Sequence, residues 1–404
     1  VVWWVPLGLI AGGHDQGHDQ ISASRAAQDQ AQPRASRATL HQRQETIASR
    51  AILHQRQETI DIPRGAQWIK LNHANAGLFR VCYSPDALRC LARAMERGEL
   101  QTGDVVGILN DTVALVVSGY VRTSVLLDLL GSFAMAAGDS YVVWQIIGAF
   151  LENLNQTWAE LAPPAVCARI VRLARSLFGP KAAALGWAHR ADDGPLVARL
   201  RSISIPRAGW AGDPLVVAQA CQLFDELYAH PDECDRRPFH HDFTASVLEI
   251  AVRSGPPINH ARVREMYENS QRWSLSEDQR MAALGAMASA PSAAQKTATL
   301  EYAMSDAVLP QDLNIVVGYM VAAAAADSAG KHVLWHWFAA NYARVVARLG
   351  ESSALLGHVV GAVVGSFATY EMADAVEAWF RDKPTAAFDR MLPQSLEFVR
   401  VRAA

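Results

Sequence analysis

The sequence predicts a mostly α-helical protein, an α-solenoid of stacked antiparallel helices preceded by part of a small β-sandwich. From Ser84 onward, apolar residues recur with a period of about 3.6 residues, which is typical of amphipathic helices. The connections between these helices are short and contain Gly, Pro or Asp. Short connections favour antiparallel neighbours, and a long succession of them favours a stacked array. Residues 3–7 and 68–83 are rich in aromatic and β-branched residues, which indicates strands.

Length and composition set limits on the class of protein. The chain has 404 residues, enough for two or three domains with a large core. Hydrophobic residues make up 50% and charged residues 19%, which favours a globular chain over a disordered one. The net charge of −3 gives no reason to expect a nucleic-acid partner, because that requires a clustered basic surface.

The sequence also predicts no membrane partner. No stretch reaches the roughly 18 uninterrupted apolar residues that a spanning helix needs, and residues 316–326, which come closest, read as a buried helix. The first residue is Val1, and the apolar residues 1–10 lack the basic region of a signal peptide. We therefore interpret residues 1–13 as a remnant strand of a β-sandwich that belongs to a larger protein.

The cysteines predict a reducing compartment and hence a cytoplasmic location. Their number is odd, they are scattered and none forms a C-x-x-C pair, so we expect buried thiols and not a disulfide framework. They are Cys82, Cys90, Cys167, Cys221 and Cys234. Sequons at Asn110 and Asn155 fall in apolar helical patterns, so glycosylation is not expected.

Residues 14–60 differ from the rest of the chain. Residues 13–16 are repeated at once as 17–20, and residues 35–47 recur at 48–60, with Ile52 in place of Thr39. Two copies are too few for a solenoid, which needs about three repeats to bury a shared face. We interpret this Gln-rich segment as a disordered loop with a tandem duplication, because polar tracts cannot bury enough surface to become ordered. A Gln-rich interaction arm is the alternative.

The helical part, residues 84–404, contains several start signals. Ser84 followed by Pro85 predicts a helix start, with Leu88, Leu91 and Met95 as its apolar stripe. Two further helices are expected at 105–117 and 123–133. Ser276 and Gln279 form a capping-box pattern, and Thr369 is expected to cap a helix. The apolar face of that last helix is predicted to comprise Met372, Ala375, Val376, Trp379 and Phe380.

Two segments near residue 68 have a pattern specific to one family. They are Trp68-Ile69-Lys70-Leu71-Asn72 and Gly77-Leu78-Phe79-Arg80-Val81-Cys82-Tyr83-Ser84-Pro85. This region resembles the point in zinc aminopeptidases of the puromycin-sensitive (gluzincin) class where a small β-domain joins the C-terminal helical domain. The resemblance runs from Trp68 to the end of the chain, is most like fungal cytosolic members, and is supported by the segments at 109–111, 185–187, 211–214, 251–255 and 376–380.

The resemblance implies a non-catalytic part of such an enzyme. In the family the helical domain forms a bowl that closes the substrate chamber, while zinc is held by H-E-x-x-H and a further Glu. None of the 13 His in this chain is followed by Glu, so we expect no catalytic residue, metal ligand or cofactor here, and zinc only in the parent enzyme. The expected partners are a peptide substrate, through the parent enzyme, and the missing N-terminal catalytic domain.

Three positions depart from the family pattern. Leu78 and Phe79 stand where the family usually has Phe and Tyr, so a hydroxyl is absent, and Cys82 replaces a common Asn. The sequence thus predicts the C-terminal fragment of an aminopeptidase, inactive alone. In that fragment residues 61–83 are the closing strands of the β-sandwich, and residues 84–404 are the helical cap domain. A stand-alone helical scaffold that binds a peptide or a protein partner is the alternative.

Other candidate sites are weaker. A cluster of His230, Cys234, His240, His241 and Asp242 contains metal-ligating residue types, but its spacing matches no known ligand pattern, and we interpret it as a solvated loop. The aromatic residues of 335–338 are expected in the core, and Gly330-Lys331 is rejected as a phosphate loop because the preceding Gly and the following Ser or Thr are missing. Arg253 and Arg264 are the candidates for binding a peptide carboxylate, because guanidinium groups bind carboxylates bidentately.

Overall fold

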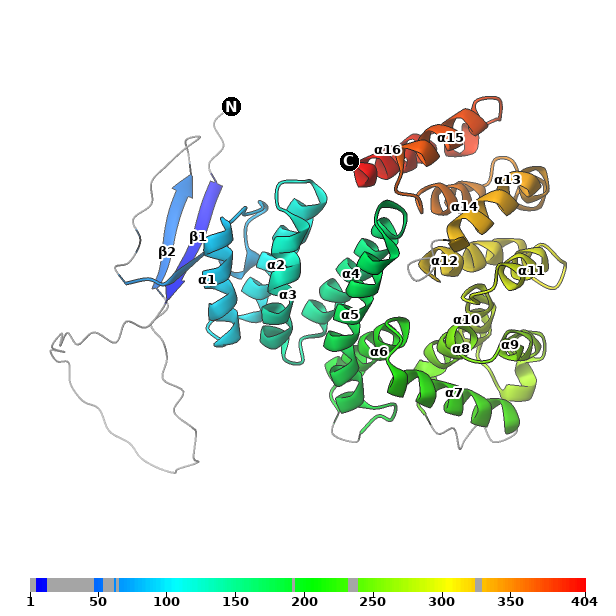
Figure 1. Ribbon diagram of the computed structural model, residues 1–404, viewed down its shortest axis with the longest axis horizontal. Helices are drawn as coiled ribbons and strands as arrows, with labels where there is room; N and C mark the ends of the chain where they lie inside the picture. The colour runs from blue at the N-terminus through cyan, green and yellow to red at the C-terminus, as the bar shows by residue number, and fades with distance from the viewer. Residues whose placement is uncertain are drawn as a thin grey trace, which may run out of the picture. The chain divides into compact units, whose positions relative to one another are not determined.

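The computed structural model describes residues 5–12, 47–53, 62, 65–190, 193–231, 239–323 and 329–404. It divides into two compact units, Val1–Gly138 and Asp139–Ala404. The described residues form sixteen α-helices and a three-stranded sheet, which confirms the prediction of a mostly α-helical protein (Figure 1). Among these residues no helix is both long and apolar enough to cross a membrane.

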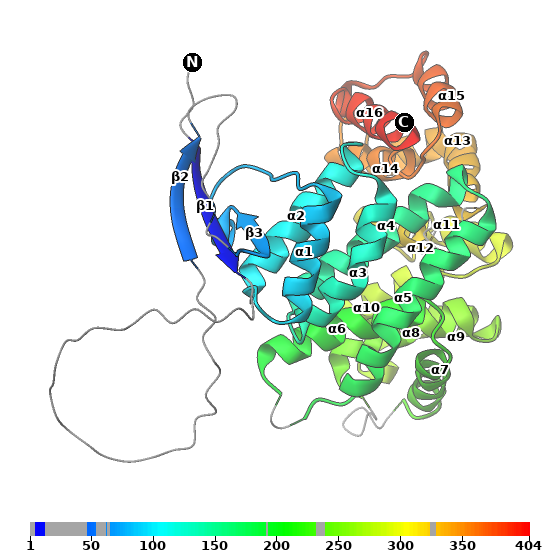
Figure 2. The ribbon, with the colours of Figure 1, turned by 60° about the vertical axis from the view of Figure 1, so that its left-hand side comes forward.

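The sheet of the first unit has β1 (Val5–Gly12) at its centre. β2 (Ile47–Leu53) and β3 (Trp68–Leu71) pair with it on either side, both antiparallel (Figure 2). On the β3 side Leu9 is opposite Leu71, and Gly12 is opposite Trp68. A Cβ atom at Gly12 would lie 2.7 Å from the Trp68 indole, so the absence of a side chain at Gly12 allows this close pairing.

The structure differs from two expectations for this region. Residues 61–83 are expected to form closing strands, but the described part of this segment contains one strand, β3, which ends at Leu71, and Asn72 adopts a left-handed conformation with φ of 55°. Within 14–60, Ile47–Leu53 form a strand and not a loop. Strand pairing satisfies the backbone N–H and C=O groups along the edge of β1, and this backbone requirement cannot be read from side-chain composition. The rest of the duplication lies outside the described residues.

Three helices complete the first unit; the first and third begin where the sequence predicts, and the second begins at Thr102, before the expected residue 105. They are α1 (Pro85–Glu96), α2 (Thr102–Val117) and α3 (Thr123–Ala137). The Ser84 hydroxyl accepts a hydrogen bond from the N–H of Ala87, and the predicted stripe of Leu88, Leu91 and Met95 is buried. α1 packs against both β3 and α3. The first compact unit therefore includes these three helices and ends at Gly138, and not near residue 84, where the helices start.

The second unit contains helices only. They are α4 (Tyr141–Leu161), α5 (Pro164–Leu185), α6 (Pro195–Trp210), α7 (Pro214–Ala229), α8 (Thr244–Ser254), α9 (Ile258–Glu268), α10 (Glu277–Ala288), α11 (Ala293–Ala303), α12 (Leu313–Ala323), α13 (Ala329–Leu349), α14 (Ala354–Val364), α15 (Tyr370–Phe380) and α16 (Met391–Ala403). From α4 to α16 each even-numbered helix contacts the next even-numbered helix, and most odd-numbered helices pack against an adjacent even-numbered one. The helices are therefore arranged in pairs along one continuous row.

The predicted caps of this unit are confirmed. The Ser276 hydroxyl accepts from the N–H of Gln279, whose side chain accepts from the N–H of Ser276. Thr369 caps α15 by accepting from the N–H of Met372. On α15 Val376 and Phe380 are buried as predicted, Met372 and Trp379 are half-buried, and Ala373 is buried in place of the exposed Ala375. Trp335, Trp337 and Phe338 are buried, as expected for core residues.

Candidate functional site

One face of α4 combines acidic and amide side chains in the second unit. Glu152, Gln156 and Glu160 follow one another at intervals of four residues, and Asn153 is three residues before Gln156, which places all four on the same side of the helix. We call this set the polar face of α4. Its partners come from helices throughout the unit, and most of them are cations.

The end of the polar face forms a buried ion pair with α13. The Nζ of Lys331 lies 3.1 Å from Glu160 and donates a hydrogen bond to the carbonyl oxygen of Gln156 at 2.8 Å. The other carboxylate oxygen of Glu160 accepts from the N–H of Ala368 at 2.7 Å. The two charged side chains are 0% and 5% exposed. Burial lowers the pKa of Lys331, although the Glu160 carboxylate opposes this effect.

The last helix of the chain also reaches the polar face. Arg402 of α16 donates to the carbonyl oxygen of Gly365 at 2.7 Å and to the Asn153 side chain at 3.5 Å. Burial lowers the pKa of Arg402. The first helix of this unit therefore contacts α13, the segment before α15, and α16, so the row of helices closes on itself (Figure 1).

A second ion pair lies near the middle of α4. The Nε of Arg207, on α6, is 3.3 Å from Glu152, and its guanidinium group lies over the Phe178 ring at 5.9 Å. A Cβ atom at Gly148 would collide with the Arg207 side chain, so the glycine makes room for this contact. Burial raises the pKa of Glu152 and lowers that of Arg207, since both charged forms lose hydration.

The two arginines predicted from sequence occupy different environments. Arg253 on α8 bonds to Glu249, its side chain is 13% exposed, and burial lowers its pKa to about 10 although Glu152 opposes this effect. Its Nε has no hydrogen-bond partner among the described residues. Arg264 on α9 is half exposed, pairs with Glu268 at 2.9 Å and lies over the Tyr302 ring at 4.1 Å. Among the described residues they share no partner, and their role in peptide binding stays a prediction.

Sequence reasoning missed Glu152, Glu160 and Lys331. The available signal was a charged side chain inside an otherwise apolar helical pattern, as at Glu152, which follows Phe150 and Leu151. The partner of such a charge cannot be found by spacing when it lies far along the chain.

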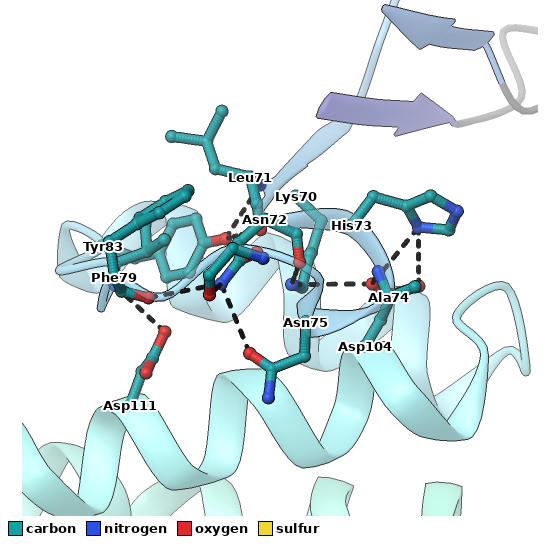
Figure 3. A network of polar contacts seen from close by, with 12 residues as sticks. Lys70, Leu71, Asn72, His73, Ala74, Asn75, Phe79, Tyr83, Asp104 and Asp111 are labelled. Carbon is teal, nitrogen blue, oxygen red and sulfur yellow. Dashed lines mark hydrogen bonds and ion pairs between the residues drawn. The ribbon is translucent and has the colours of Figure 1, made fainter. Parts of the chain in front are cut away.

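The family-like segment after β3 forms a separate network in the first unit (Figure 3). Asn72 is buried, and its side-chain amide donates to the carbonyl oxygens of Gly77 and Phe79 at 3.1 and 3.2 Å. Its side-chain oxygen accepts from the N–H of Gly77 at 2.7 Å. One side chain therefore holds both ends of the turn that follows the sheet.

Two carboxylates of α2 fix the same turn to the helices (Figure 3). Asp104 is fully buried, lies 3.5 Å from the Nζ of Lys70 and accepts from the N–H of Ala74 at 2.7 Å. Burial lowers the pKa of Lys70, and Asp104 opposes that effect. Asp111 accepts from the N–H of Val81 at 3.0 Å. These contacts are structural, because each polar group is used to hold backbone or to neutralise a buried charge.

The departures from the family pattern fall within this network. Phe79 contributes its backbone carbonyl to Asn72, and Cys82 is exposed. Tyr83 supplies the hydroxyl that the network uses, since it accepts from the N–H of Leu71 at 3.0 Å. Burial raises the pKa of Tyr83, so the hydroxyl stays protonated at neutral pH.

The predicted histidine loop is only partly described. Cys234 lies outside the described residues, and His230 is exposed at the end of α7. His240 and Asp242 come together with His189, which the sequence analysis did not consider, and these three could hold a metal ion. None of them belongs to an H-E-x-x-H motif, so the residues of this chain do not fit the catalytic zinc of gluzincins.

The fold defines a helical domain that follows a sheet, with a structural network at the junction, and the sequence contains no H-E-x-x-H motif. Residues 68–401 match the ERAP1-like C-terminal domain, and the chain belongs to this family.

The curated relatives are aminopeptidases. Alanine/arginine aminopeptidase of Saccharomyces cerevisiae is 27% identical over 341 residues, which are 84% of this chain and 38% of the relative. Aminopeptidase 2 of Candida albicans is 27% identical over 348 residues, or 85% and 36% of the two chains. Aminopeptidase M1-A of Oryza sativa is 25% identical over 336 residues, or 83% and 37%. The matched region thus spans well under half the length of these relatives.

Proposed function

We propose that this chain is the C-terminal cap of a zinc aminopeptidase that removes N-terminal residues from peptides. The observation that carries this proposal is the family match over residues 68–401, together with aminopeptidase relatives of which it spans about a third. In this proposal the zinc ligands and the catalytic groups belong to an N-terminal domain, and this chain supplies a wall of the substrate chamber.

The second unit supports the role of a chamber wall. Its helix pairs follow the pattern of an α-solenoid, which presents a concave surface for binding. The contacts from the polar face of α4 to α13 and α16 hold the two ends of the row together. A closed row has a fixed curvature, and a fixed curvature would limit how much of a peptide the chamber accepts.

The sheet of the first unit supports the position of a domain junction. A hollow of about 410 Å³ beside β3 and α1 is lined mainly by apolar side chains, among them Leu9, Trp68 and Leu71. Ile62 at its edge is 48% exposed. We propose that further strands of a β-sandwich cover this hollow in the intact enzyme, because uncovered apolar surface favours association.

The proposal places the enzyme in the cytoplasm. Four free cysteines are found among the described residues, and thiols are kept reduced in that compartment. Fractionation of cells with an antibody to this chain would test the location.

The deciding test is the coding sequence upstream of Val1. The proposal expects an in-frame H-E-x-x-H with a further Glu ligand downstream of it. A reading frame that opens near Val1 without that motif would contradict it and favour a stand-alone scaffold. The purified chain is expected not to hydrolyse amino-acid aryl amides, and turnover that a chelator abolishes would show that the chain has its own catalytic site.

A further inference from the structure

Two loops of the second unit bring three metal-ligating side chains together. His189 lies between α5 and α6, while His240 and Asp242 lie in the segment that leads into α8. Asp242 Oδ2 is 3.3 Å from His240 Nδ1 and 3.9 Å from His189 Nε2. One ligand atom from each residue lies within 4.8 Å of the others.

The polar atoms of this cluster are not satisfied by each other. His189 Nε2 is buried and has no hydrogen-bond partner among the described residues. A buried polar atom without a partner loses its hydration and gains nothing in return. His240 Nδ1 lies 3.3 Å from Asp242 Oδ2 and 3.4 Å from the backbone nitrogen of Asp242. In the tautomer with its proton on Nε2, Nδ1 has one in-plane lone pair, and a cation between that nitrogen and the Asp242 carboxylate would bind both groups.

The distances suit a small divalent ion. Imidazole nitrogen and carboxylate oxygen bind zinc at about 2.0–2.2 Å, so two ligands of a tetrahedral site lie about 3.3–3.5 Å apart. One pair in the cluster already has this spacing, and small side-chain rotations would bring His189 closer. We propose that His189, His240 and Asp242 bind one divalent transition-metal ion of the zinc class, which joins the two loops.

Two neighbouring side chains support the cluster. His241 Nε2 lies 3.2 Å from the other Asp242 oxygen, where a hydrogen bond from the imidazole would orient the carboxylate. The ring of Phe243 is 5.7 Å from that of His189 and shields one side of the cluster.

This proposal differs from the sequence analysis, which expects no metal ligand in this chain. The reason is that His189 lies 51 positions before His240 in the numbering, so no local spacing could include it. The proposed ion has a structural role, because it would tie the loop between α5 and α6 to the segment that leads into α8.

The test is zinc binding by the full, tag-free chain, measured by isothermal titration calorimetry with a thiol reductant present. Co²⁺ serves as a second probe, because its visible absorption reports a site of low coordination number. The variants are Asp242→Asn and His189→Gln, one from each loop, so that one of them stays informative if the other fails to fold. The matched control is His336→Asn, because His332 and His336 lie four residues apart on α13 and are a second pair of histidines to which zinc could bind.

The proposal expects one equivalent of zinc and a rise in the melting temperature on binding, since a ligand that binds only the folded state stabilises it. Each cluster variant should weaken binding at least tenfold, consistent with loss of a ligand, and His336→Asn should leave it unchanged. Binding that the cluster variants leave intact, or that His336→Asn abolishes, would overturn the proposal. So would the absence of stoichiometric binding at micromolar zinc.

Discussion

Replacing Glu160 by Ala is expected to loosen the closure of the helical unit. The change leaves the Lys331 charge buried with no opposite charge, while the N–H of Ala368 loses its acceptor. Removing one member of a buried ion pair costs about 3–5 kcal/mol. A change of about 1.4 kcal/mol alters the equilibrium constant for local opening tenfold. Amide exchange in α4 and α13 should therefore accelerate by roughly 100-fold or more, unless these amides already exchange by global opening.

Hydrogen exchange with mass spectrometry is the appropriate assay, since a chain of two units need not unfold in one step. The control is Glu268→Ala, which removes the partner of the half-exposed Arg264 in the same unit. An exposed pair contributes about 0–1 kcal/mol, so exchange in α9 should change less than about fivefold. Pairing Glu160→Leu with Lys331→Met should recover much of the loss, because no buried charge then remains unpaired. Equal effects of Glu160→Ala and Glu268→Ala would refute the reasoning.

Two further changes test the electrostatics and the capping of the same unit. The Glu152 carboxyl has a raised pKa in the folded chain, so above its ordinary value of 4.5 the folded state binds more protons than the unfolded state and stability falls as pH rises toward the folded value. Glu152→Gln should flatten that slope in urea titrations across mildly acidic pH, and an unchanged slope would contradict the assignment. Ser276→Ala removes a capping box and should cost about 1 kcal/mol. Ser292→Ala, at a helix start without a side-chain cap bond, should cost under about 0.5 kcal/mol, and equal losses in urea unfolding would argue against the cap.

The candidate site shows where local reasoning ends. The segment from Trp68 to Pro85 identifies the junction because its residues are consecutive. In the structure these residues form hydrogen bonds with one another within a turn and with Asp104 of α2. Arg253 is predicted from its residue type alone. Its pairing with Glu249, four residues earlier on α8, follows from helical spacing, whereas its burial near Glu152 depends on packing between helices. Lys331 was considered only as part of a phosphate loop, whereas its actual partners are Glu160 and Gln156 of α4.

The sequence by itself determined the class of fold, the starts of several helices and the family. These features depend on neighbours a few residues apart, such as the Ser84 cap or the stripe from Leu88 to Met95, so periodicity and capping chemistry are enough to find them. Tertiary structure alone decided that β2 pairs with β1, that α4 contacts the last helix and that His189 meets Asp242. These contacts join residues far apart along the chain. Which of these contacts form depends on burial and backbone pairing over the whole folded chain, and a local sequence pattern contains no information about either.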